Sequence, residues 1–139
     1  MKLVAFLIFL LPLTLLAQSQ TDYENAMHKF QKFYNVGLGD SIGAMFTYEP
    51  SEPRPPKPLW TNESNASALE EFGTLKSFHF IGVDKSDTYD VYVFLTDFSK
   101  AGESTTSLTL KKDKSLGTFR FMTTSVGISD LVKKYKNNR

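Results

Sequence analysis

The sequence of 139 residues contains no cysteine, only two histidines and a single tryptophan. Without cysteine the chain forms no disulfide, carries no lipid on an N-terminal cysteine, and supplies no thiolate to a zinc site. Sixteen Lys and Arg stand against fifteen Asp and Glu, so an excess of one charge is lacking too. We therefore expect no metal, no cofactor and no nucleic-acid partner, since a nucleic-acid-binding surface needs a basic patch.

Long hydrophobic runs are absent except at the N-terminus. Lys2 precedes an apolar run over residues 3–16, which ends at Ala17 before a polar stretch. The run is shorter than the roughly 20 residues of a membrane-spanning helix and contains a proline, so it predicts a cleavable signal peptide over residues 1–17. The mature domain, residues 18–139, is then expected to be secreted or periplasmic, without a membrane anchor, and formally uncharged.

Helical spacing of apolar residues marks the first half of the mature chain. In residues 21–35 six apolar side chains recur at intervals that place them on one helix face, and a capping-box pattern opens the segment. A short helix and a third helix over residues 65–72 are expected to follow. Between them, the stretch 49–61 holds every proline of the mature chain. Because proline fixes its backbone angle and donates no hydrogen bond, we predict an irregular loop there.

Alternation of apolar and polar residues takes over after Gly73. The second apolar segment carries aromatic and β-branched residues on both faces, which is typical of a central strand covered on both sides. Short polar connections favour antiparallel hairpins. The sequence thus predicts an α+β domain, with N-terminal helices packed on a curved, cone-shaped, four-stranded antiparallel sheet. The expected strands are 76–83, 89–98, 104–110 and 117–123, and a helix over 129–136 lies in the C-terminal segment 125–139.

Three segments resemble the nuclear transport factor 2-like superfamily. They are the end of the first helix (residues 30–35), the short helix (41–46) and the entry to the first strand (73–78), and the likeness covers most of residues 21–124. Within the superfamily, the chain is similar to an uncharacterised bacterial branch found ahead of serine β-lactamase-type hydrolase domains. The resemblance implies a cone-shaped α+β barrel that often dimerises through its sheet, so a homodimer is expected.

Residues 39–43 match the G-x-S-x-G pattern of a hydrolase nucleophile elbow. That elbow follows a strand, and its triad needs a histidine after the acid. Here the preceding segment is predicted to be helical, and the only histidine after Ser41 is His79. We therefore interpret the pattern as a glycine-flanked helix cap and expect no catalytic residue there.

His79 is the one weak catalytic candidate. It shares a strand face with Ser77, and if that face lines the cone it could pair with Asp90 or Asp97 and act as a base. The resemblance supports this reading, because enzymes of the superfamily place a histidine or aspartate in such a pocket. The alternative reading is an exposed or structurally satisfied sheet histidine.

We predict an exported, non-catalytic binding or protein-interaction domain. Its aromatic cone either accepts a small apolar ligand or is filled by the protein's own side chains. Two alternatives remain open: an enzyme using His79 with a carboxylate, and a stand-alone accessory domain of a serine hydrolase. The residues expected to line the ligand pocket are Phe30, Tyr34, Phe46, Trp60 and Phe94.

Overall fold

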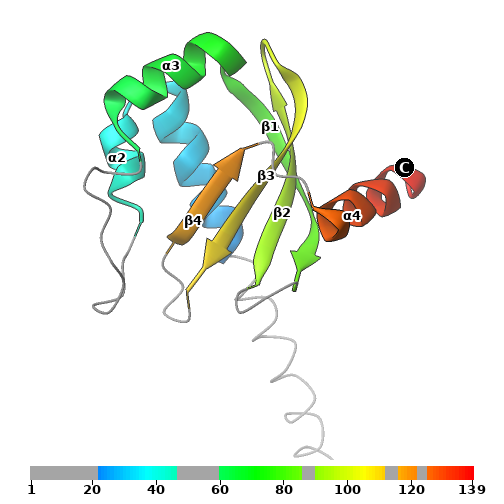
Figure 1. The fold of residues 1–139 in the computed structure, drawn as a ribbon. Helices are drawn as coiled ribbons and strands as arrows, with labels where there is room; N and C mark the ends of the chain where they lie inside the picture. The colour runs from blue at the N-terminus through cyan, green and yellow to red at the C-terminus, as the bar shows by residue number, and fades with distance from the viewer. Residues whose placement is uncertain (1–21, 47–59, 86–89, 112–115, 122–124) are drawn as a thin grey trace, which may run out of the picture.

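The computed structural model describes residues 22–46, 60–85, 90–111, 116–121 and 125–139. The predicted signal peptide and nearly all of the predicted proline-rich loop lie outside this part of the chain. None of the described helices has the length and apolar character to cross a membrane. A helix of residues 22–35 comes first, followed by α2 (Gly39–Gly43), α3 (Asn62–Phe72), β1 (Leu75–Asp84), β2 (Val91–Phe98), β3 (Gly102–Leu110), β4 (Leu116–Phe121) and α4 (Val126–Asn137) (Figure 1).

The four strands form one antiparallel sheet in the order β1-β2-β3-β4, so each strand pairs with its neighbour in the sequence. The helix of residues 22–35 packs on one face, which we call the inner face, and α4 lies beside β1 on the opposite, outer face (Figure 1). The predicted α+β class, with helices ahead of a four-stranded antiparallel sheet, is confirmed.

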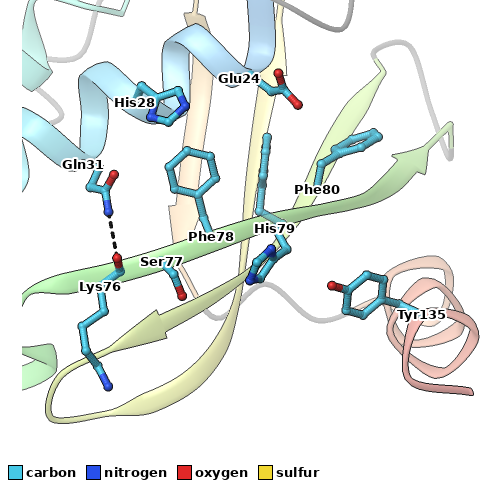
Figure 2. Close-up of a pocket in the computed structure, with 10 residues that line it drawn as sticks. Glu24, His28, Gln31, Lys76, Ser77, Phe78, His79, Phe80 and Tyr135 are labelled. Atoms are coloured by element: carbon cyan, nitrogen blue, oxygen red, sulfur yellow. Dashed lines mark hydrogen bonds between the residues drawn. The ribbon is translucent and has the colours of Figure 1, made fainter. Parts of the chain in front are cut away.

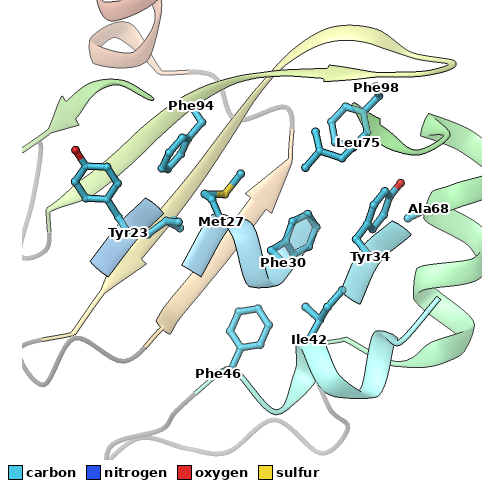
Figure 3. Packing of buried hydrophobic residues seen from close by; sticks show 11 residues of the cluster. Tyr23, Met27, Phe30, Tyr34, Ile42, Phe46, Ala68, Leu75, Phe94 and Phe98 are labelled. Atoms are coloured by element: carbon cyan, nitrogen blue, oxygen red, sulfur yellow. The ribbon is translucent and has the colours of Figure 1, made fainter. Parts of the chain in front are cut away.

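The inner face of the sheet meets the apolar stripe of the N-terminal helix. Tyr23, Met27, Phe30 and Tyr34 recur at helical spacing and are all buried (Figure 3). Burying an aromatic or aliphatic side chain of this size stabilises a fold by about 1.5–3 kcal/mol. The stripe predicted from the sequence is therefore the main contact between helix and sheet. Its partners on the sheet include Leu75, Phe78, Phe80, Tyr92, Phe94, Phe98, Leu108, Phe119 and Phe121.

The outer face of β1 is shielded by α4. Gly82 provides the room for this contact, because a Cβ there would come within 2.6 Å of the Leu131 side chain. Val93, opposite Gly82, and Leu95 also point to the outer face and are nevertheless buried. The prediction that the second strand is covered on both sides is thus confirmed.

Helices α3 and α4 each begin about one turn earlier than predicted. Thr61 caps α3 by accepting a hydrogen bond from the Ser64 backbone N–H, and the Ser64 hydroxyl accepts one from the Thr61 N–H in return. Ser125 caps α4 by accepting from Ile128 N–H at 3.2 Å. These caps satisfy backbone donors that the first turn of a helix leaves without partners, so polar residues ahead of the apolar stripe become helical.

Candidate functional site

The G-x-S-x-G segment forms α2, a short helix that follows another helix. A Cβ on Gly39 would overlap the carbonyl oxygen of Thr61, and a Cβ on Gly43 would overlap that of Trp60. The two glycines are one helical turn apart, so they let one side of α2 lie directly on the backbone that leads into α3. The motif therefore has a packing role: its two glycines let α2 contact the backbone of Trp60 and Thr61 directly.

Asp40 and Asn62 join α2 to α3 by exchanging hydrogen bonds. The Asp40 N–H donates to Asn62 Oδ1, and the Asn62 N–H donates to Asp40 Oδ1, both at 3.0 Å. Asn62 Nδ2 also donates to Asp40 Oδ2 at 2.8 Å. The Asp40 carboxylate therefore lies at the start of α3, where negative charge is favourable. The Asp40 side chain is engaged in holding α2 against α3.

Asn65 links Trp60 to the N-terminal helix. Its side chain is completely buried, accepts a hydrogen bond from Trp60 Nε1 at 3.1 Å, and donates to the Tyr34 carbonyl oxygen at 3.0 Å. A buried amide is stable only when its donor and acceptor find partners, and this one has both. The indole of Trp60 is thereby held in one orientation.

A mostly apolar cleft lies between α3 and β4, with Trp60 on its wall. Its volume is about 530 Å³. The Phe121 ring lies 5.5 Å from the Trp60 ring and 5.8 Å from the Phe72 ring, measured between centroids. All three side chains are only partly buried, so they present aromatic surface to the cleft. The lining residues are Trp60, Thr61, Glu63, Ser64, Ser67, Ala68, Glu71, Phe72 and Phe121.

Among the described residues of this lining, the ionisable groups are the carboxylates of Glu63 and Glu71. The charge of Glu71 reaches Tyr34, whose hydroxyl donates to the Gly73 carbonyl at 2.8 Å. Burial, together with the Glu71 charge, raises the pKa of Tyr34 to about 12. The cleft is thus an apolar depression with a negatively charged rim.

The five residues predicted to line a pocket occupy different places. Phe30, Tyr34 and Phe46 are buried in the core, where Phe30 stacks on Phe119 with ring centroids 3.9 Å apart. Trp60 is the one that lines the apolar cleft, and Phe94 lines a different cleft along β1. Phe72 and Phe121 also line the apolar cleft; neither was expected there from the sequence, although both belong to predicted elements. Their signal was an aromatic residue at the end of a helix or strand.

His79 lies on the outer face of β1 and is exposed. Its neighbour on β2 is Leu95, while Asp97 forms an ion pair with Lys76 at 2.9 Å. Asp90 is exposed just before β2. In the described part of the chain no hydrogen bond or ion pair joins His79 to an acid, so the structure does not bring the proposed base and its carboxylate together.

Both histidines instead line one polar cleft of about 580 Å³ that runs along β1 (Figure 2). His28 reaches it from the N-terminal helix and His79 from the outer face of the strand. Within the described ranges, no three His, Asp or Glu side chains are grouped closely enough to hold a metal ion. Comparisons with protein-family models, curated proteins and solved structures returned no match to this chain.

Proposed function

We propose that this chain is an exported, non-catalytic binding domain whose apolar cleft takes a small apolar ligand. The observation that carries the proposal is the position of Trp60, an aromatic side chain fixed by Asn65 on the wall of an open apolar cleft. The cleft volume of about 530 Å³ lies within the range of ligand sites, about 300–1,000 Å³. An aromatic wall with a few polar groups at the rim is the composition that such sites share.

The rim charges select among apolar ligands. Glu63 and Glu71 face the cleft, and none of the described residues that line it is a Lys, Arg or His. A carboxylate or sulfonate on the ligand would be repelled, whereas a neutral or cationic head group would be attracted. We therefore propose a neutral or cationic amphiphile as ligand class.

Export and a place in the nuclear transport factor 2-like superfamily are parts of the same proposal. The apolar run over residues 3–16 supports export, and helices on an antiparallel sheet support the superfamily. Enzymatic activity is not proposed, because His79 lacks an acidic partner among the described residues. N-terminal sequencing of the exported protein tests the signal peptide: a mature N-terminus at Gln18 supports it, and an intact Met1 contradicts it.

Trp60 is the only tryptophan of the chain, so its fluorescence reports directly on the cleft. Titration with the neutral fluorescent probe N-phenyl-1-naphthylamine is expected to quench Trp60 emission and to enhance probe emission with the same saturation curve. An anionic analogue, 1-anilinonaphthalene-8-sulfonate, is expected to bind at least threefold more weakly. Absence of any saturable change with either probe would refute the proposed ligand class.

Two alanines on α3 provide a matched pair of variants. Ala68 lines the cleft and is nearly buried, whereas Ala66 is exposed and does not line it. Ala68→Leu extends a side chain into the cleft and is expected to raise the probe Kd at least tenfold. Ala66→Leu makes the same chemical change elsewhere on the helix and is expected to leave Kd unchanged. Equal effects of both variants would place the probe outside the cleft.

A further inference from the structure

The edge of β1 that does not pair with β2, which we call the free edge, forms the floor of the polar cleft. Among the described strands β1 pairs with β2 alone, so its other edge is the end of the sheet. A strand in this position presents a row of backbone N–H and C=O groups with which a further strand can pair. The cleft follows this row over residues 76–80.

Side-chain amides of the N-terminal helix already pair with the start of this edge. Asn35 Nδ2 donates to the Leu75 carbonyl at 3.0 Å, and the Leu75 N–H donates to Asn35 Oδ1 at 2.8 Å. Gln31 Nε2 donates to the Lys76 carbonyl at 3.2 Å (Figure 2). Asn35 therefore exchanges two hydrogen bonds with one strand residue, as the facing residue of an antiparallel neighbour does. The edge receives amide groups in the geometry of strand pairing.

The direction of the following backbone groups can be worked out from these contacts. The Lys76 carbonyl points away from β2, toward the free edge. Because the peptide bond is trans, the Ser77 N–H then points toward β2. Register with β2 is regular from Ser77 to Phe80, and along a regular strand the polar groups alternate between the two edges. The backbone N–H and C=O groups of Phe78 and Phe80 therefore both point toward the free edge, away from β2. No hydrogen bond from a described residue reaches these groups from that side.

Side chains from the N-terminal helix and from α4 lie on either side of this edge, so the cleft has the form of a channel. On the inner side, Glu24 and His28 project from the N-terminal helix, and the His28 ring lies 4.8 Å from that of Phe78. On the outer side, His79 and Tyr135 of α4 border the cleft (Figure 2). Most of these lining groups are polar, which suits a ligand with a polar backbone better than an apolar small molecule.

The open part of the edge is short. It begins after Lys76, where Gln31 binds, and it ends at the bulge between Phe80 and Gly82. At about 3.4 Å per residue, the four residues from Ser77 to Phe80 span about 14 Å. This length accommodates an extended segment of about four residues.

We propose that the β1 edge binds a short extended peptide of a partner protein, which adds to the sheet as a further strand. Recognition of this kind uses main-chain hydrogen bonds for affinity and alternate side chains for specificity. Side chains on one side of the bound peptide would contact Phe78 and Phe80, which favours apolar residues there. Those on the other side would contact Ser77 and His79, which favours polar ones.

A second copy of the chain fits this edge less well than a peptide does. Two copies paired through β1 about a twofold axis would each bring an N-terminal helix to the same face of the joined sheet. Both helices would then overhang the same few residues, because Gln31 and His28 already reach the edge of their own strand. A peptide without its own helix avoids this conflict.

The first experiment selects binders and maps where they bind. Random heptapeptides displayed on phage are selected against the protein expressed from the full-length chain, and amide exchange is followed by NMR with the best synthetic peptide. The expected result is slower exchange at Phe78 and Phe80, with Ser77 and His79 unchanged, because only the first two direct N–H groups outward. Three results overturn the proposal: no selected binder, protection elsewhere, or self-association that protects the same amides without peptide.

The second experiment separates backbone pairing from side-chain contact. N-methylation of the edge-facing amides of the selected peptide removes donors but keeps every side chain, and is expected to weaken binding at least tenfold. Phe78→Pro removes one outward N–H of the protein, whereas Phe78→Ala removes the same ring and keeps the N–H. The proline variant is expected to lose at least tenfold in affinity relative to the alanine variant. Equal binding by the methylated and unmethylated peptides contradicts strand addition, even if the proline variant fails to fold. Because Trp60 lies in the other cleft, its fluorescence tests the apolar ligand site separately.

Discussion

Asn65 gives the sharpest test of how the apolar cleft is built. Replacing it with alanine removes the hydrogen bonds to Trp60 Nε1 and to the Tyr34 carbonyl, each worth about 1 kcal/mol. The Tyr34 carbonyl also accepts from the Gly37 N–H at 3.1 Å, and Trp60 is only half-buried, so neither group is left wholly without a partner. The small void left by the amide adds to the loss, while the higher helix propensity of alanine returns about 0.6 kcal/mol.

The expected loss in the free energy of unfolding for Asn65→Ala is therefore about 2 kcal/mol. For a domain of this size that corresponds to a fall in Tm of roughly 8 °C. Urea unfolding followed by the fluorescence of Trp60 measures the free energy of unfolding, and a thermal melt followed by the same signal measures Tm. Native emission should also shift to longer wavelength and become more accessible to acrylamide, because the indole is no longer held.

Ser67→Ala is the matched control on the same helix. Ser67 is exposed, and its hydroxyl donates only to the Glu63 carbonyl within α3. Its replacement should change the free energy of unfolding by less than about 0.5 kcal/mol. If Asn65→Ala is equally mild, or if Trp60 emission is unchanged, then Asn65 does not hold the indole and our account of the cleft fails.

Two further predictions concern the groups around this cleft. The pKa of Tyr34 is raised from 10.0 to about 12, so the stability that the neutral hydroxyl confers should be complete below pH 10 and be lost as the pH approaches 12. The Tyr34→Phe variant should be about 1 kcal/mol less stable than the unmodified protein at pH 7 and should lack this alkaline loss of stability. Urea unfolding of both proteins at pH 7 and at alkaline pH measures the difference, and the same alkaline loss in both would contradict the role of the Tyr34 hydroxyl. Gly43→Ala should destabilise the protein by about 1–3 kcal/mol, because its Cβ would overlap the Trp60 carbonyl, whereas Ser41→Ala should stay within about 0.5 kcal/mol in thermal melts. A larger effect at Ser41 than at Gly43 would contradict the packing role of the motif.

The sheet and the apolar stripe could be predicted because each depends on local periodicity. Alternation over residues 76–83 and 104–110 placed β1 and β3 to within two residues of their observed ends. Helix starts were less accurate, because Thr61 and Ser125 act through hydrogen bonds to backbone groups further along the chain. The spacing of apolar residues alone does not reveal these hydrogen-bonded caps.

The candidate site could be predicted only in part. Trp60 was named from its aromatic character, but the role of Asn65 depends on Tyr34, which is 31 positions earlier in the chain. A signal was nevertheless present: Asn65 lies three residues before Ala68 and seven before Phe72, on the face of α3 that turns inward. A polar residue at such a position indicates a buried hydrogen bond whose partner only the folded chain identifies.

The contact between α2 and the start of α3 has a consequence for protein engineering. Gly43 rests on the backbone of Trp60, and Asp40 is bonded to Asn62, so the two ends of the connection over residues 47–59 are held close together by contacts outside it. Closing a longer loop between fixed ends costs little, about 0.6 kcal/mol for each doubling of its length. A reporter or affinity tag inserted in this connection should therefore leave the rest of the domain intact and place the inserted sequence next to Trp60.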